Sequence, residues 1–119
     1  MDEDGRIRIK GRRKEIIIRG GENLSAREID DNLVGCPGVG ESATIGMPDD
    51  RLGERICTFV APLGDTVPTL ESVTAYLEGE GVPNRLWPER IEIIDEIPKT
   101  LMGKVRRNVL TDELAARMA

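Results

Sequence analysis

The sequence contains no histidine, only two cysteines and only 3% aromatic residues among its 119 positions. Without histidine, the chain has no imidazole to act as a general base and no histidine-containing zinc site. Cys36 and Cys57 are too few for a disulfide scaffold, and their spacing matches no metal-binding motif. We interpret them as reduced thiols, which favours a cytoplasmic protein.

Long apolar runs are also missing. No stretch approaches the roughly 20 apolar residues that a membrane span needs, and no apolar segment typical of a secretory signal stands near the first residue. Apolar residues make up 39% of the chain, which allows one modest core in one domain of this length. With so few aromatic residues, Leu, Ile and Val must supply most of that core.

Charge is distributed unevenly along the chain. The net charge of −5 argues against general binding to nucleic acid. Residues 22–98 carry an excess of acidic residues, whereas residues 1–21 and 99–119 carry an excess of Lys and Arg. Both basic segments place glycine next to the charge, at Arg19-Gly20-Gly21 and at Gly103-Lys104. Because glycine lets a phosphate approach the backbone closely, these two points are candidate anion sites, with ordinary solvated charge as the alternative.

Hydrophobic periodicity and turn residues predict an α+β fold. We expect a small domain with an N-terminal β-hairpin, set apart from a central sheet of about three strands that is flanked by helices. The expected elements, in chain order, are strands near 6–10 and 15–18, a helix capped by Ser25, strands near 43–46 and 56–61 with a polar loop 48–55 between them, a helix capped by Thr69, a strand near 91–94, a loop 98–103 and a C-terminal helix from Val105.

The first helix has the clearest local signal. Ser25 and Glu28 have the spacing of a capping box, in which each side chain bonds the other residue's backbone amide. The apolar residues Ile29, Leu33 and Val34 follow at helical spacing, so we expect them to share the buried face.

Three segments resemble motifs of the acyl-adenylate-forming enzymes, which include acyl-CoA synthetases, the adenylation domains of peptide synthetases and firefly luciferase. Residues 11–25 (GRRKEIIIRGGENLS) resemble a signature of the family, and residues 98–107 (PKTLMGKVRR) resemble its C-terminal lysine motif. Residues 46–55 (GMPDDRLGER) match a loop between two of its strands. The sequence departs from the pattern at Met102, where the family often has a small hydroxyl residue.

The resemblance implies a division of the chain. Residues 1–14 would form the junction and hinge with the first hairpin strand, and residues 15–119 the C-terminal lid domain of an adenylate-forming ligase. The family's large N-terminal adenylation domain, which holds the acyl pocket, the adenine site and a phosphate loop, is missing from this sequence. We therefore expect an excised C-terminal domain that is inactive alone, with a free-standing natural subunit as the alternative.

The resemblance also implies an activity. The enzyme would be an ATP-dependent acyl-CoA ligase that converts a carboxylic acid to acyl-AMP and transfers the acyl group to CoA, with Mg²⁺ bound to ATP through ligands outside this chain. Three alternatives stay open. The enzyme could load a carrier-protein thiol, or the chain could be a non-catalytic module that binds CoA or phosphate, or a protein-interaction domain.

Five residues match functional positions of the family. Lys104 matches the catalytic lysine of the adenylation step. Arg12 matches an arginine that contacts the nucleotide, and Lys14 matches the hinge. Gly20 and Gly21 match the segment that lines the channel for CoA during thioester formation. The simpler interpretations are a solvated lysine, an exposed turn arginine and an ordinary glycine turn.

Overall fold

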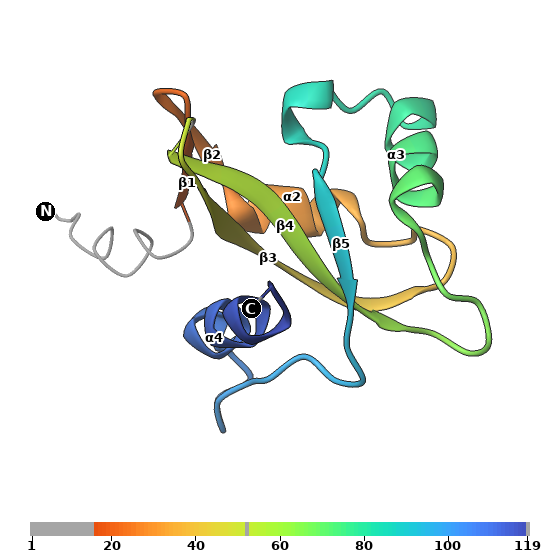
Figure 1. Cartoon of the computed structure of the whole chain (residues 1–119). Helices are drawn as coiled ribbons and strands as arrows, with labels where there is room; N and C mark the ends of the chain where they lie inside the picture. Colours follow the sequence, from red (N-terminus) through yellow and green to blue (C-terminus); the bar gives the residue numbers. More distant parts are fainter. Residues whose placement is uncertain (1–15, 52, 119) are drawn as a thin grey trace, which may run out of the picture.

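The computed structural model describes residues 16–51 and 53–118. The predicted α+β class is confirmed (Figure 1). The elements, in chain order, are β1 (Ile16–Arg19), β2 (Glu22–Ser25), α2 (Ala26–Asn32), β3 (Val39–Asp49), β4 (Gly53–Pro62), α3 (Leu70–Gly79), the 3₁₀ turn η2 (Asn84–Leu86), β5 (Arg90–Ile93) and α4 (Arg107–Met118).

Strand β4 organises the sheet. It pairs along its length with β3 in antiparallel fashion, and its other edge pairs with β1 at Gly53 and, further along, with β5 in parallel from Cys57 to Val60. β2 pairs with β1 and completes the order β2-β1-β4-β3, with β5 beside β4. Within the described ranges the sheet thus has five strands rather than about three, because the hairpin joins it.

The strand that we predicted near 15–18 has a pairing partner that the sequence analysis did not name. We expected the strand near 15–18 to pair with a strand near 6–10, and this earlier segment lies outside the described residues. The observed hairpin pairs β1 with β2 across the turn at Gly20 and Gly21. It is also not set apart from the sheet, because Arg19 of β1 pairs with Gly53 of β4.

Both predicted helix caps are present, but of the capping box predicted at Ser25 and Glu28 only the hydrogen bond to the Ser25 hydroxyl forms. The Ser25 hydroxyl accepts a hydrogen bond from the Glu28 amide at 3.2 Å, which confirms Ser25 as the cap of α2. The predicted apolar face was wrong at Val34, which is 77% exposed, because α2 ends at Asn32 and the chain turns there. Thr69 caps α3 through a reciprocal pair of hydrogen bonds with Ser72.

The predicted polar loop 48–55 is much shorter than expected. β3 and β4 stay paired up to Asp49 and Gly53, so only a tight turn joins them. Strand pairing uses backbone groups, and polar side chains can point to solvent from paired residues. The polar side chains of this segment therefore led us to predict a loop where two strands end.

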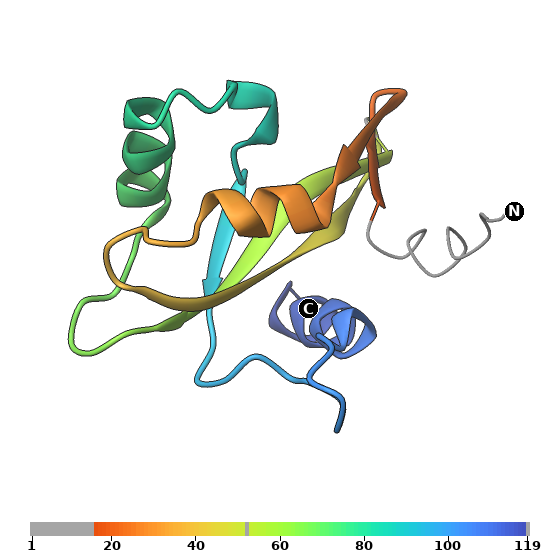
Figure 2. The same cartoon turned by 180° about the vertical axis from the view of Figure 1, so that it is seen from behind.

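Alternation along β3 and β4 divides the core between the two faces of the sheet. One face buries Phe59 and Ile45 against Leu110 and Leu114 of α4. The opposite face buries Ile56 of β4 in the cluster that also contains residues of the hairpin and α2. Figures 1 and 2 show α4 and α2 on opposite sides of the sheet. No helix in the described part of the chain is long and apolar enough to cross a membrane.

Candidate active site: the Lys104 loop and the Gly20–Gly21 turn

Residues 99–105, just before α4, form a tight hairpin-like loop that is held by its own hydrogen bonds and is called the Lys104 loop below. The Gly103 amide donates to the Thr100 carbonyl oxygen at 2.9 Å, and the Thr100 amide donates to the Lys104 carbonyl oxygen at 2.8 Å. Gly103 has a φ of +85°, the left-handed conformation that a type I turn with a bulged glycine requires. An antiparallel bridge between Lys99 and Val105 closes the base of the loop.

The Thr100 side chain adds two more hydrogen bonds inside this loop. Its hydroxyl oxygen accepts from the amides of Met102 and Lys104, each at 3.2 Å. The hydroxyl that the family often places next to the glycine is replaced here by Met102, but Thr100 still supplies a hydroxyl to the loop. Our sequence reasoning missed this role, although a threonine at the first position of a turn is a known signal.

The side chain of Lys104 is exposed at the end of this reversal. No acidic side chain in residues 16–51 or 53–118 forms an ion pair with it. Its neighbours at the tip, Leu101 and Met102, are also exposed. The domain thus holds the Lys104 backbone in place and leaves the ammonium group available to a ligand. The catalytic role of Lys104 stays a prediction.

Gly20 and Gly21 form the two-residue turn between β1 and β2. Their φ angles are +58° and +84°, and the flanking residues Arg19 and Glu22 are paired. Positive φ at both central residues is the requirement of a type I′ hairpin turn, and glycine meets it without strain. A Cβ atom added to Gly21 would meet no atom within 4 Å, so the position that this atom would take is open.

Ion pairs hold the glycine turn in place. The Glu89 carboxylate accepts hydrogen bonds from Arg19 at 2.7 Å and from Arg55 at 2.8 Å. Burial pushes the pKa of Glu89 upward, but the hydrogen bonds from Arg55 and Arg19 outweigh it, and the pKa lies below its usual value. Arg85, in η2, pairs with Glu22 at 3.2 Å on the other side of the turn. The hairpin end is therefore tied to the rest of the sheet.

The two predicted functional segments do not come together. The Gly20–Gly21 turn lies at one end of the sheet and the Lys104 loop near the other, and both views show this separation (Figures 1 and 2). Arg12 and Lys14, the predicted nucleotide contact and hinge, lie outside the described residues. The chain thus presents two separate candidate faces.

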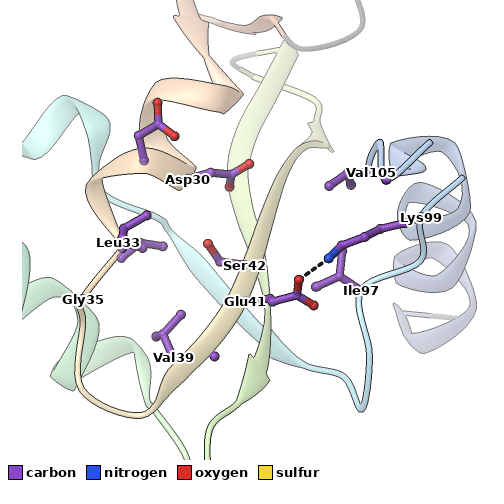
Figure 3. Close-up of a pocket in the computed structure, with 13 residues that line it drawn as sticks. Asp30, Leu33, Gly35, Val39, Glu41, Ser42, Ile97, Lys99 and Val105 are labelled. Carbon is purple, nitrogen blue, oxygen red and sulfur yellow. Dashed lines mark hydrogen bonds and ion pairs between the residues drawn. The ribbon is translucent and has the colours of Figure 1, made fainter. Parts of the chain in front are cut away.

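A pocket of about 380 Å³ adjoins the Lys104 loop and was not expected from the sequence. It lies between the end of α2, the start of β3 and the loop, and Gly103 is one of its lining residues. The Lys99 side chain extends from the loop across the pocket and forms an ion pair with Glu41 of β3 (Figure 3). Asp30 lines the pocket from α2.

The described residues contain neither a disulfide nor a metal-binding cluster. Cys36 and Cys57 are both buried and unbonded to each other. Burial raises the pKa of the Cys57 thiol to about 12, so it is protonated at neutral pH. No group of three or more Cys, Asp or Glu side chains in residues 16–51 and 53–118 has an arrangement that could hold a metal ion.

The model of one protein family, the AMP-binding enzyme C-terminal domain, matches residues 28–104. The chain belongs to this family. The match to the AMP-binding C-terminal domain begins just after the cap of α2 and ends at Lys104. It therefore includes the Lys104 loop and excludes the Gly20–Gly21 turn.

Curated relatives of this AMP-binding C-terminal domain are ligases. The medium-chain fatty-acid–CoA ligase of Escherichia coli is 40% identical over 121 residues, and the 2,3-dihydroxybenzoate-AMP ligase of Bacillus subtilis is 35% identical over 118 residues. Both alignments cover 99% of this chain, but only 21% and 22% of the two relatives. The chain thus spans about a fifth of the length of these relatives.

Solved structures of similar proteins have the same fold. The apo structure of MbtA from Mycobacterium smegmatis matches with a TM-score of 0.77 and 34% identity, covering 84% of this chain and 19% of that one. A fatty acyl CoA synthetase from Mycobacterium tuberculosis matches with a TM-score of 0.76 and 32% identity, covering 87% of this chain and 20% of that one. The chain is thus the C-terminal domain found in AMP-forming ligases.

Proposed function

We propose that this chain supplies the adenylation lysine, Lys104, of an ATP-dependent acid–thiol ligase. In the first half-reaction, a carboxylate oxygen of the substrate attacks the α-phosphorus of ATP, and pyrophosphate leaves with the electrons of the broken P–O bond. Negative charge on the phosphate oxygens would be stabilised by a positioned ammonium group. The observation that carries the proposal is an exposed Lys104, with no ion-pair partner among residues 16–51 and 53–118, on a loop fixed by its own hydrogen bonds.

The second half-reaction would use the glycine turn. The thiol of CoA loses its proton and attacks the carbonyl carbon of acyl-AMP, and AMP leaves. The open space at Gly21 supports a close approach of the pantetheine arm to the backbone there. Because the two faces lie far apart on this domain, using both would require the domain to rotate between the half-reactions. In this proposal Lys14 is the hinge and Arg12 contacts the nucleotide.

The rest of the enzyme completes the site in this proposal. An N-terminal adenylation domain would bind the carboxylic acid and the adenine, which agrees with relatives about five times longer than this chain. Mg²⁺ would be held by the ATP phosphates and by that domain, since the described residues offer no metal cluster. We also propose that the enzyme works in the cytoplasm.

CoA is our proposed acyl acceptor, supported by the similarity to a fatty-acid–CoA ligase. A carrier-protein thiol is the second candidate, because a Mycobacterium tuberculosis relative named salicyl-AMP ligase / salicyl-S-ArCP synthetase is 31% identical over 112 residues. Offering CoA and a phosphopantetheinylated carrier protein to the full-length enzyme, with the same acyl-AMP, would decide between the two acceptors.

Exchange of labelled pyrophosphate into ATP tests the role of Lys104. In the full-length enzyme that contains this chain, we expect Lys104→Ala to reduce the exchange rate about a hundredfold or more. The matched control is Arg106→Ala, which removes another exposed positive charge from the same segment and should leave the exchange near its normal rate. Normal exchange by Lys104→Ala would contradict the proposal.

A further inference from the structure

One arginine fixes the base of the Lys104 loop to the body of the domain. Arg107 is the first residue of α4, and its Nε donates to the Thr44 carbonyl oxygen of β3 at 2.9 Å. Its Nη2 donates to Oδ2 of Asp30, in α2, at 2.6 Å. We propose that Arg107 and Asp30 are positioning residues that set the direction in which the loop presents Lys104. This proposal rests on the proposed function of Lys104.

The ion pair is largely shielded from water, which restricts its geometry. The Arg107 side chain is only 13% exposed and the Asp30 side chain 16% exposed. Oδ1 of Asp30 is buried and has no hydrogen-bond partner within the described residues. Because charges in such surroundings are costly without a partner, removing the arginine leaves a buried carboxylate poorly compensated. The planar guanidinium also bonds two groups in different directions, which a lysine ammonium does less well.

A short chain of contacts leads from Arg107 to Lys104. The Arg106 amide donates to the Pro98 carbonyl oxygen at 2.9 Å, and Val105 pairs with Lys99 at the base of the loop. The Val105 side chain packs against the core cluster that includes the α4 residues. A shift of Arg107 would therefore move the base of the loop, and with it the lysine three positions earlier.

The loop has a second contact with the sheet, but it is weaker. Lys99 forms an ion pair with Glu41 of β3, and their side chains are 36% and 48% exposed. Exposed pairs of this kind contribute little to stability because water screens them. Figure 3 shows Lys99 directed at Glu41 of β3, with Asp30 on the α2 side of the pocket. We therefore assign the anchoring to Arg107 and Asp30.

The same helix provides a matched control. Arg117, near the other end of α4, donates to the Ile93 carbonyl oxygen at 2.8 Å and pairs with Glu92 at 3.0 Å. Like Arg107, it thus joins α4 to a strand carbonyl and to a carboxylate. Replacing Arg117 removes similar contacts at the end of the helix that is far from Lys104.

The first test compares half-reactions in the full-length enzyme. We expect Arg107→Gln to reduce pyrophosphate exchange by about tenfold to a hundredfold, because small displacements of a catalytic group are costly. Thioester formation from added acyl-AMP should stay near normal, and Arg107→Lys should restore part of the exchange. Arg117→Gln should leave the ratio of pyrophosphate exchange to thioester formation at its native value. The same ratio of these two rates in Arg107→Gln as in Arg117→Gln would overturn the proposal.

The second test measures the loop directly and does not depend on catalysis. Hydrogen exchange of the amides in residues 99–106 should be about tenfold faster in Arg107→Gln than in the native enzyme, which corresponds to about 1.4 kcal/mol. Arg117→Gln should not accelerate this segment. Unchanged exchange in Arg107→Gln would overturn the anchoring. Normal pyrophosphate exchange by Lys104→Ala would instead overturn the proposed function and leave the anchoring result standing.

Discussion

The glycine turn offers a test in which strain and function can be separated. Gly21 has a φ of +84°, so a leucine there must adopt a left-handed conformation, which costs about 1–2 kcal/mol. A Cβ atom at this position meets nothing within 4 Å, so the first side-chain carbon adds no steric clash to the cost. We therefore expect Gly21→Leu to lower the free energy of unfolding by about 1–2 kcal/mol while the domain stays folded.

Gly81 is the matched control for this substitution. It has a φ of +78°, a Cβ atom there also meets nothing within 4 Å, and it lies in the turn after α3. Gly81→Leu should therefore lower the free energy of unfolding by a similar amount. The measurements are urea unfolding, pyrophosphate exchange and thioester formation from added acyl-AMP, each on the native enzyme and on both variants.

Only Gly21→Leu should slow thioester formation, because its side chain would occupy the space proposed for the pantetheine arm. Adenylation should be unaffected in both variants. Equal loss of the two half-reactions in Gly21→Leu would refute the channel role of the turn. A loss of thioester formation in Gly81→Leu as large as in Gly21→Leu would show that strain, and not position, causes the defect.

Two further predictions concern pH and the hinge. Burial raises the pKa of Asp30 to about 6, against the opposing effects of Thr44 and Arg107 and with a small contribution from Asp31. The folded state thus binds this proton more tightly than the unfolded state, so the contribution of Asp30 to the free energy of unfolding should fall by about 3 kcal/mol as pH rises from below 4 to above 6. The Asp30→Asn variant should lack this pH-dependent part of the free energy of unfolding. A difference in stability between the variant and the native protein that does not change with pH would contradict the prediction. Lys14→Pro, which fixes φ at the proposed hinge, should slow one half-reaction more than the other, and equal rates relative to native would argue against a rotation at that residue.

Local signals in the sequence predicted local structure well. The caps Ser25 and Thr69 are confirmed, since each side chain accepts an amide hydrogen at its helix start. The strand near 91–94 is confirmed as β5 with a shift of one residue. These features depend on residues that are close in the chain, where turn and cap chemistry determines the backbone.

Partners distant in the chain were harder to predict. The pairing of β1 with β2 and with β4 depends on which strands meet, and Gly20 and Gly21 form the tight turn that favours the pairing observed. The polar residues of the loop predicted at 48–55 gave no indication that backbone pairing continues through them. Composition reports side chains, whereas the sheet is extended by backbone hydrogen bonds.

The candidate site shows the same division. The position of Lys104 in an exposed loop followed from the glycine beside it and from the family motif. The ion pair between Arg107 and Asp30 did not, because 77 positions separate the two residues and the motif at 98–107 does not indicate which residue Arg107 contacts. Only the packing of α4 against the sheet brings the two side chains together.

The most direct measurement of the central claim compares both half-reactions in one preparation of the full-length Lys104→Ala enzyme. We expect pyrophosphate exchange into ATP to fall about a hundredfold or more, whereas added acyl-AMP should be converted to thioester at close to the native rate. Exchange at the native rate, or an equal loss of both half-reactions, would contradict the claim that Lys104 acts in adenylation.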